Sequence, residues 1–258
     1  MPDPRTDAEL AAMAADLLDH RLRRETRSAI TDDGPLSIDE AYRIQSYVTS
    51  ARLERGERIA GWKLGYTSEA MRVQMGVASP NFGPLTDAML LATGDTASPA
   101  LMQPRVEPEI GLVFARDLVA PTTVADVLDA VANAVACLEV VDSVYTGYRF
   151  HLEDNTADGS SAAQVVVGPP LSGIDALDEI EVALVRNGAA VATARGSAAS
   201  GHPALGVVWL AEQLARTGRV VRAGDLVITG GLTAAAPLEP GDVIGATFSG
   251  GAEVSVLR

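Results

Sequence analysis

An almost unbroken apolar segment near the middle of the chain, residues 135–141, contains a single carboxylate, Glu139. A short apolar run of this kind is typical of a strand that is buried on both faces. An ionised carboxylate is costly to bury, so Glu139 must face solvent, pair with a cationic group or bind a metal ion. The segment therefore restricts the chain to folds that provide solvent, a cationic group or a metal ion beside a carboxylate in the middle of a strand.

A second acidic signal lies upstream, where Glu107 and Glu109 open another apolar run. Side chains alternate between the two faces of a strand, so these two carboxylates are expected to point the same way. Two like charges held side by side need a positive charge between them. Arg105 has the same parity and could supply it, but a divalent cation could do so better, because carboxylate oxygens suit Mg²⁺ or Mn²⁺. With Glu139, the pair would leave about three octahedral positions for water or substrate.

One lysine has an unusual setting, because Lys63 lies between Trp62 and Leu64 and is bracketed by Gly61 and Gly65. Such glycines indicate a short strand beside a place where backbones approach closely. Burial lowers the pKa of a lysine and can make it a proton donor and acceptor. Alternatively, the apolar stem could carry the ammonium group to solvent at a strand end. The sequence leaves both interpretations of Lys63 open.

Charge and composition exclude several classes of function. The chain has 20 basic and 34 acidic residues in 258, a net charge of −14 with histidine neutral, which disfavours nucleic acid and anionic membranes as partners. The single cysteine, Cys137, excludes a disulfide framework and a cysteine-rich zinc site. Neither a signal-peptide pattern nor an apolar run of about 18 residues is present. We therefore expect a cytoplasmic protein.

The periodic patterns predict an α+β fold. Helices are predicted at residues 7–24, 38–55, 68–75, 124–136 and 206–216. Strands are predicted at residues 106–114, 138–141, 180–184 and from residue 191 onward. Ser37 and Glu40 form a predicted capping box, and Asn187-Gly188 predicts a hairpin. We expect an α-rich N-terminal portion, residues 1–95, packed against a β-rich catalytic core, residues 96–258.

Several short motifs follow one another along the chain. They are GWKLGYTS at residues 61–68, PNFG at 80–83, PRVEPEI at 104–110, LEVVDS at 138–143 and ADGSS at 157–161. In this combination the chain resembles the 2-keto-4-pentenoate hydratase and 4-oxalocrotonate decarboxylase group of the fumarylacetoacetate hydrolase superfamily. The resemblance covers roughly residues 36–258.

The resemblance implies a twisted β-roll core with a helical and mixed N-terminal portion, and substrates that are small anionic 2-oxo acids from the meta-cleavage of aromatic compounds. It implies homo-oligomers and, for decarboxylases, a complex with the neighbouring pathway enzyme. It assigns Mg²⁺ or Mn²⁺ to Glu107, Glu109 and Glu139. It implies catalytic roles for Lys63, Asp87 and Ser161. Substrate contacts are expected from Leu64, Asn81, Arg105 and Asp158.

Two reactions and one non-catalytic role are consistent with these motifs. We expect first a hydratase that adds water to a 2-hydroxy-2,4-dienoate and gives a 4-hydroxy-2-oxo acid. The alternative is decarboxylation of 4-oxalocrotonate, a 2-oxo-3-enedioate. The chain departs from the common family pattern at Asn81, where hydratases commonly have Asp, and at Gly159, where Asn is common. These departures keep open a third role, a non-catalytic metal-binding partner subunit of a related enzyme.

Overall fold

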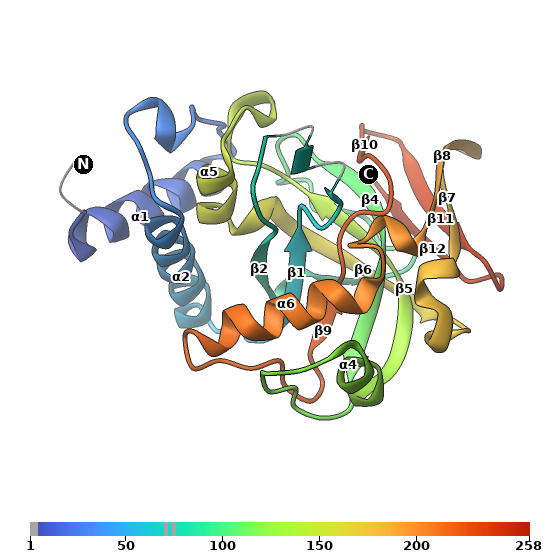
Figure 1. Ribbon diagram of the computed structural model, residues 1–258. Coiled ribbons are helices and arrows are strands. Elements are labelled where there is room, and N and C mark those ends of the chain that lie inside the picture. The colour runs from blue at the N-terminus through green and yellow to red at the C-terminus, as the bar shows by residue number, and fades with distance from the viewer. Residues whose placement is uncertain (1–4, 70–71, 74–75) are drawn as a thin grey trace.

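The computed structural model describes residues 5–69, 72–73 and 76–258 of the chain. Its architecture is α+β, as predicted, with a curved central sheet, a smaller sheet to one side and helices packed around them (Figure 1). Four positions of the helix predicted at residues 68–75 lie outside the described residues. Within the described ranges, no helix has both the length and the apolar character needed to cross a membrane.

The two sheets are built mostly from antiparallel neighbours. The larger sheet runs in the order β2 (Asn81–Thr86), β1 (Ile59–Gly65), β9 (Leu226–Ile228), β4 (Arg105–Phe114), β5 (Val131–Val141), β6 (Ala162–Pro170) and β3 (Leu90–Ala92), with β10 (Ala236–Pro237) paired to β4. The smaller sheet runs in the order β12 (Glu253–Leu257), β11 (Val243–Phe248), β7 (Glu181–Arg186) and β8 (Ala189–Arg195). The larger sheet takes strands from both sides of residue 95, so the two predicted portions share it.

Helices cover the N-terminal side and one edge of the fold. The α-helices that lie wholly within the described residues are α1 (Asp7–Arg23), α2 (Ile38–Glu54), α4 (Val124–Ala130), α5 (Leu152–Ala157) and α6 (Pro203–Ala215). Short 3₁₀ turns are η1 (Ile30–Asp32), η2 (Asp87–Met89), η3 (Thr146–Tyr148), η4 (Gly159–Ser161), η5 (Ile174–Glu179) and η6 (Gly196–Ala198). The capping box predicted at Ser37 and Glu40 is confirmed, because each side chain bonds the backbone of the other residue.

The boundary between α4 and β5 differs from the prediction. The sequence predicts a helix through residue 136, but α4 ends at Ala130 and β5 begins at Val131. Alanines at positions 132, 134 and 136 favour a helix, yet this stretch pairs with β4, and its side chains are buried from Ala134 onward. Tertiary pairing and burial therefore override the local helix propensity. The hairpin predicted at Asn187-Gly188 is confirmed between β7 and β8.

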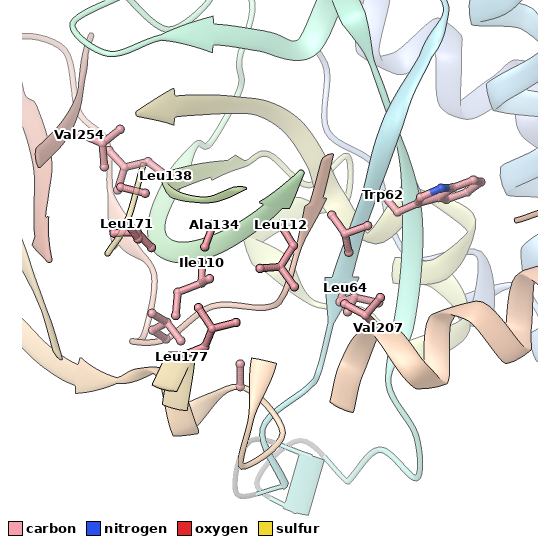
Figure 2. Close-up of a cluster of buried hydrophobic side chains, with 14 of the residues drawn as sticks. Trp62, Leu64, Ile110, Leu112, Ala134, Leu138, Leu171, Leu177, Val207 and Val254 are labelled. Atoms are coloured by element: carbon pink, nitrogen blue, oxygen red, sulfur yellow. The ribbon is translucent and has the colours of Figure 1, made fainter. Parts of the chain in front are cut away.

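The main core lies between the larger sheet, the smaller sheet and α6. Figure 2 shows Leu64 of β1 beside Val207 of α6, and Leu138 of β5 near Val254 of β12. A separate apolar cluster joins α1 and α2 to the chain around Tyr145, which is fully buried. Helix α2 also contacts α5, and α5 contacts the η4 turn, which lies against β1 and β2.

Candidate functional site

Three carboxylates meet where β4 and β5 pair. Glu107 lies directly opposite Glu139 in the antiparallel register, and Glu109 follows on the same face of β4. One carboxylate oxygen from each of Glu107, Glu109 and Glu139 lies within 4.8 Å of the other two. Glu109 and Glu139 are fully buried. The structure therefore brings together the three acidic residues that the sequence singled out.

The free atoms of this cluster suit a divalent cation. Glu109 Oε2 accepts a hydrogen bond from the Gly230 backbone N–H at 2.6 Å. Glu109 Oε1 and Glu139 Oε1 are buried and accept no hydrogen bond from the described residues. Buried polar atoms rarely stay unsatisfied, and an all-oxygen donor set is the kind that Mg²⁺ and Mn²⁺ prefer. The donor chemistry and the unpaired oxygens thus both fit a hard divalent ion.

A glycine keeps space open at the same place. A Cβ atom at Gly231 would lie 2.2 Å from Glu107 Oε2, closer than any real contact, so any other residue would displace this carboxylate. The backbone of Gly230-Gly231 forms one wall of the carboxylate cluster, where Gly230 donates a hydrogen bond and Gly231 leaves room.

The carboxylates have strongly shifted acidities. Burial is the largest cause and the charge of Glu139 adds to it, so the pKa of Glu107 rises from 4.5 to about 8. The same two causes, together with the charge of Glu107, hold the pKa of Glu109 well above its ordinary value. In the absence of a cation, Glu107 therefore retains its proton at neutral pH, and the shift at Glu109 favours its protonated form in the same way. A divalent ion would favour the ionised forms and displace those protons.

Lys63 lies in β1, two residues before the C-terminal end of the strand, and its side chain is next to the carboxylates. Its side chain is 5% exposed, which excludes the alternative of an ammonium group extended to solvent. Burial lowers the pKa of Lys63, but the charges of the three neighbouring glutamates outweigh it and hold this pKa above its ordinary value. Nζ lies 3.0 Å from Glu139 Oε2 and donates a hydrogen bond to the Ser160 carbonyl oxygen at 2.7 Å.

That carbonyl belongs to a strained turn. Gly159, Ser160 and Ser161 in η4 have successive φ values of +69°, +58° and +56°. Left-handed conformations of this kind cost non-glycine residues about 1–3 kcal/mol each and persist where surrounding contacts enforce them. Here the turn aims the Ser160 carbonyl oxygen at Lys63 and places Ser161 in the wall of a cavity. The strain is therefore located at the site itself.

An amide network supports the turn from the end of β2. Asn81 is fully buried, and its Nδ2 donates to Asn155 Oδ1 at 2.9 Å and to Thr156 Oγ1 at 3.0 Å. Its Oδ1 accepts from Ser160 Oγ at 2.9 Å, and Asn155 Nδ2 in turn donates to Ser161 Oγ at 3.0 Å. An ionised aspartate could not donate the first two bonds. The asparagine at position 81 therefore orients the turn.

A cavity of about 370 Å³ opens onto Lys63 and Glu107. Its lining residues are Lys63, Leu64, Gly65, Tyr66, Thr67, Ser68, Arg105, Glu107, Val141, Tyr148, Phe150, Asn155, Ser160, Ser161, Gly231, Ala234 and Ala235. Charged side chains (Lys63, Arg105 and Glu107) and apolar side chains (Leu64, Val141 and Phe150) share this lining. At the rim, the Arg105 guanidinium lies 4.3 Å from the centroid of the Tyr148 ring. The volume suits a substrate of a few carbon atoms.

Of the residues expected to act on the substrate, Asn81, Asp87 and Asp158 do not line this cavity, and Asn81 is fully buried within the amide network instead. Asp87 lies beyond the opposite end of β2 from Asn81, where it forms an ion pair with Arg58. Asp158 is buried beside the η4 turn and forms an ion pair with Arg21 of α1. The structure thus separates Asp87 from the other candidate residues and places Asp158 behind the cavity wall.

Comparison with known proteins identifies the family. The model of the fumarylacetoacetate (FAA) hydrolase C-terminal family matches residues 59–256. The chain belongs to this family. It is 38% identical over 220 residues to a 2-keto-4-pentenoate hydratase of Paraburkholderia xenovorans (strain LB400), covering 83% of this chain and 81% of the relative. It is 33% identical over 252 residues to a 4-oxalocrotonate decarboxylase of Pseudomonas putida, covering 96% of each.

A solved structure of the fumarylacetoacetate hydrolase fold superposes on almost the whole chain. The 4-oxalocrotonate decarboxylase from Pseudomonas putida G7, complexed with magnesium and adipate, gives a TM-score of 0.94 at 32% identity and covers 98% of both chains. The curved sheet and the helical N-terminal portion therefore both belong to the family fold. The similar proteins include hydratases as well as decarboxylases, and these are lyases.

Sequence reasoning missed three residues that shape this family site. Tyr148 supports the Arg105 guanidinium, Asn155 bonds both Asn81 and Ser161, and Arg21 pairs with Asp158. All three come from the N-terminal helix or from the chain between β5 and β6, outside the motifs that carry the carboxylates. The motif at residues 157–161 lies close to Asn155 in the sequence, but it does not single out that side chain.

Proposed function

We propose that this chain is a divalent-metal-dependent lyase that acts on a small 2-oxo acid through its enol or enolate form. The observation that carries the proposal is the convergence of three carboxylates, two fully buried and one partly buried, and one buried lysine beside a small cavity. Glu107, Glu109 and Glu139 would hold the ion. When bound, Mg²⁺ or Mn²⁺ would supply Lewis-acid stabilisation of the negative charge on the 2-oxo oxygen.

Lys63 would hold the proton that moves during the reaction. Its ammonium group is anchored by Glu139 and by the Ser160 carbonyl, so one of its N–H bonds remains free to face the cavity. A buried proton donor at a fixed position can protonate a substrate carbon and take the proton back in a later step. Ser161, in the same wall, would hydrogen-bond the substrate or the attacking water.

Hydration of a 2-hydroxy-2,4-dienoate is the first candidate reaction. The enol proton is lost, the terminal carbon gains a proton, and the substrate becomes a 2-oxo-3-enoate. Water then adds its hydroxyl to C4 and a proton to C3, which gives the 4-hydroxy-2-oxo acid. The apolar side chains in the cavity lining suit the uncharged end of this substrate, and 2-keto-4-pentenoate hydratases are among the most similar relatives.

Decarboxylation of a 2-oxo-3-enedioate is the second candidate, and Arg105 favours it. This guanidinium packs on the Tyr148 ring and, within the described residues, pairs with no carboxylate. It is exposed at the cavity rim, two positions before Glu107 on the same strand and about 7 Å along it. It could therefore bind a second carboxylate at the far end of the substrate. In this reaction the bond from C5 to that carboxylate breaks, and the electron pair moves through the alkene onto the 2-oxo oxygen.

A direct assay separates these possibilities. The purified chain would be given 2-hydroxypenta-2,4-dienoate and 2-oxohex-3-enedioate separately, with Mg²⁺, with Mn²⁺ and with a chelator. We expect metal-dependent hydration of the first compound. CO₂ release from the second without hydration of the first would reverse the order of the two candidates. Failure to turn over either compound would favour the non-catalytic partner subunit.

A further inference from the structure

The C-terminal turn of α1 reaches the wall of the candidate site. Arg21 Nε and Nη2 both donate to Asp158 Oδ1, at 3.1 and 2.5 Å. The same Nη2 donates to the Asp142 carbonyl oxygen at 3.0 Å. One guanidinium therefore joins the residue that precedes the η4 turn to the residue that follows β5, the strand carrying Glu139.

The carboxylate that Arg21 holds is fixed at both oxygens. Asp158 Oδ2 accepts a hydrogen bond from the Val144 backbone N–H at 3.1 Å, and the side chain is 1% exposed. Asp158 is immediately followed by the three left-handed residues of η4. Because its carboxylate cannot swing away, the start of the turn is held in place, and the Ser160 carbonyl oxygen stays within hydrogen-bond distance of Lys63.

We propose that Arg21 is a positioning residue for the proton-transfer site, acting through Asp158 and the η4 turn on Lys63 and Ser161. This inference rests on the proposed function, because it assigns Arg21 a role in that reaction. A lysine could not replace Arg21 fully. The planar guanidinium directs two N–H groups at the Asp158 carboxylate and also donates a hydrogen bond to the Asp142 carbonyl oxygen, whereas an ammonium group lacks this geometry. The N-terminal helix, which carries no family motif, thus becomes part of the catalytic apparatus.

The test compares two arginines of the same helical turn. Arg21→Met removes the guanidinium but keeps an apolar stem. Arg23→Met is the matched control, because Arg23 is 63% exposed and pairs with Asp19 at 2.6 Å on the surface of α1. We expect Arg21→Met to lower kcat by about 10- to 100-fold, with KM and Mg²⁺ affinity within about twofold of wild type. Arg23→Met should match wild type in all three quantities.

Two further measurements keep the inference separate from the proposed function. Hydrogen exchange of the backbone amides at residues 158–162 should accelerate in Arg21→Met and stay unchanged in Arg23→Met, whether or not a substrate is known. Arg21→Lys should recover part of the lost kcat, as should guanidinium ions added to Arg21→Ala. Unchanged exchange, or wild-type kcat in Arg21→Met, would overturn the role of Arg21. A wild-type chain without turnover would instead overturn the proposed function, and the exchange result would still decide whether Arg21 holds the turn.

Discussion

Lys63 and Glu139 form a buried ion pair in which Nζ lies 3.0 Å from Oε2. This pair neutralises one of three neighbouring carboxylates. If all three were ionised, a net charge of about −2 would remain in a buried site, which no protein interior sustains without compensation. The structure admits two forms of compensation, protons on Glu107 and Glu109 or one divalent cation.

Exchange between protons and the cation should be measurable. At pH 7, binding of Mg²⁺ should release about one proton per ion, because a pKa of about 8 leaves Glu107 largely protonated in the metal-free protein. The raised pKa of Glu109 acts in the same direction. Isothermal titration calorimetry in buffers of different ionisation enthalpy measures this number. Apparent Mg²⁺ affinity should also rise as pH increases toward 8. Identical heats in all buffers would contradict the shifted acidities.

The stability of the metal-free protein should fall as pH rises. The folded-state pKa of Glu107 is about 8, above the ordinary 4.5, so between these values the folded state holds a proton that the unfolded state has lost. The free energy of unfolding should therefore decrease from about pH 4.5 to about pH 8, by the order of a few kcal/mol. Thermal melts across this range test it, with saturating Mg²⁺ expected to raise the Tm most at the alkaline end.

The variant Glu109→Gln sharpens that experiment. It should lower activity by about 10²–10³-fold or more because the ion loses a buried oxygen ligand. It should also flatten the pH dependence of metal-free stability, because an amide carries no charge to desolvate. Circular dichroism would show a folded chain. Near-normal turnover in this variant would refute the assignment of Glu109 to the metal.

The loss of Lys63 should separate proton transfer from metal binding. In Lys63→Met, kcat should fall by about 10²–10⁴-fold, as expected for loss of a general acid and base. Affinity for Mg²⁺ should increase, because the ammonium no longer competes with the ion for Glu139. Calorimetry and steady-state kinetics measure the two effects independently. A parallel loss of activity and metal affinity would indicate a structural role for Lys63 instead.

Part of this site could be predicted from local sequence, because strand alternation and burial are local properties. A carboxylate inside an apolar strand and two others at a spacing of two both imply a buried cation. The register that sets Glu107 opposite Glu139 is not local, yet it follows once β4 and β5 pair. The same pairing explains the error at residues 131–136, where alanines favour a helix but contacts with β4 decide the structure.

Other features depended on backbone geometry that no sequence pattern signals. Two serines at positions 160 and 161 adopt left-handed conformations that serine rarely occupies, so the direction of the Ser160 carbonyl could not be inferred. The ion pair between Arg21 and Asp158 joins residues 137 positions apart through the packing of α1. The role of Asp87 was inferred from resemblance, and the position of a residue near a motif does not fix which end of a strand it occupies.

The position of Asp87 leads to a prediction of no effect. Asp87→Asn should leave kcat and KM within about twofold of wild type, because the side chain lies beyond the far end of β2 and bonds Arg58. Steady-state kinetics under the conditions used for Glu109→Gln provide the comparison. A loss of activity greater than about tenfold would restore Asp87 to the catalytic machinery, through a movement that the structure does not contain.

Replacement of Arg105 should distinguish the two candidate substrates. Its guanidinium rests on the Tyr148 ring, whose hydroxyl lies 3.1 and 3.0 Å from the carbonyl oxygens of Gln103 and Val141, so the platform is rigid. In Arg105→Leu, KM for 2-oxohex-3-enedioate should rise by about tenfold or more, because the substrate loses the binding free energy of one charge-assisted hydrogen bond. KM for 2-hydroxypenta-2,4-dienoate should change little, because that substrate has no second carboxylate.

The same reasoning predicts which kinetic constant changes. The distal carboxylate loses its charge as CO₂ leaves, so a guanidinium that binds it stabilises the bound substrate more than the transition state. Removal of Arg105 should therefore raise KM for the dicarboxylate while kcat stays the same or increases. If Arg105→Leu instead lowered kcat for both substrates alike, the guanidinium would act on the carboxylate and 2-oxo group that they share, and the rim of the cavity would carry no information about chain length or charge.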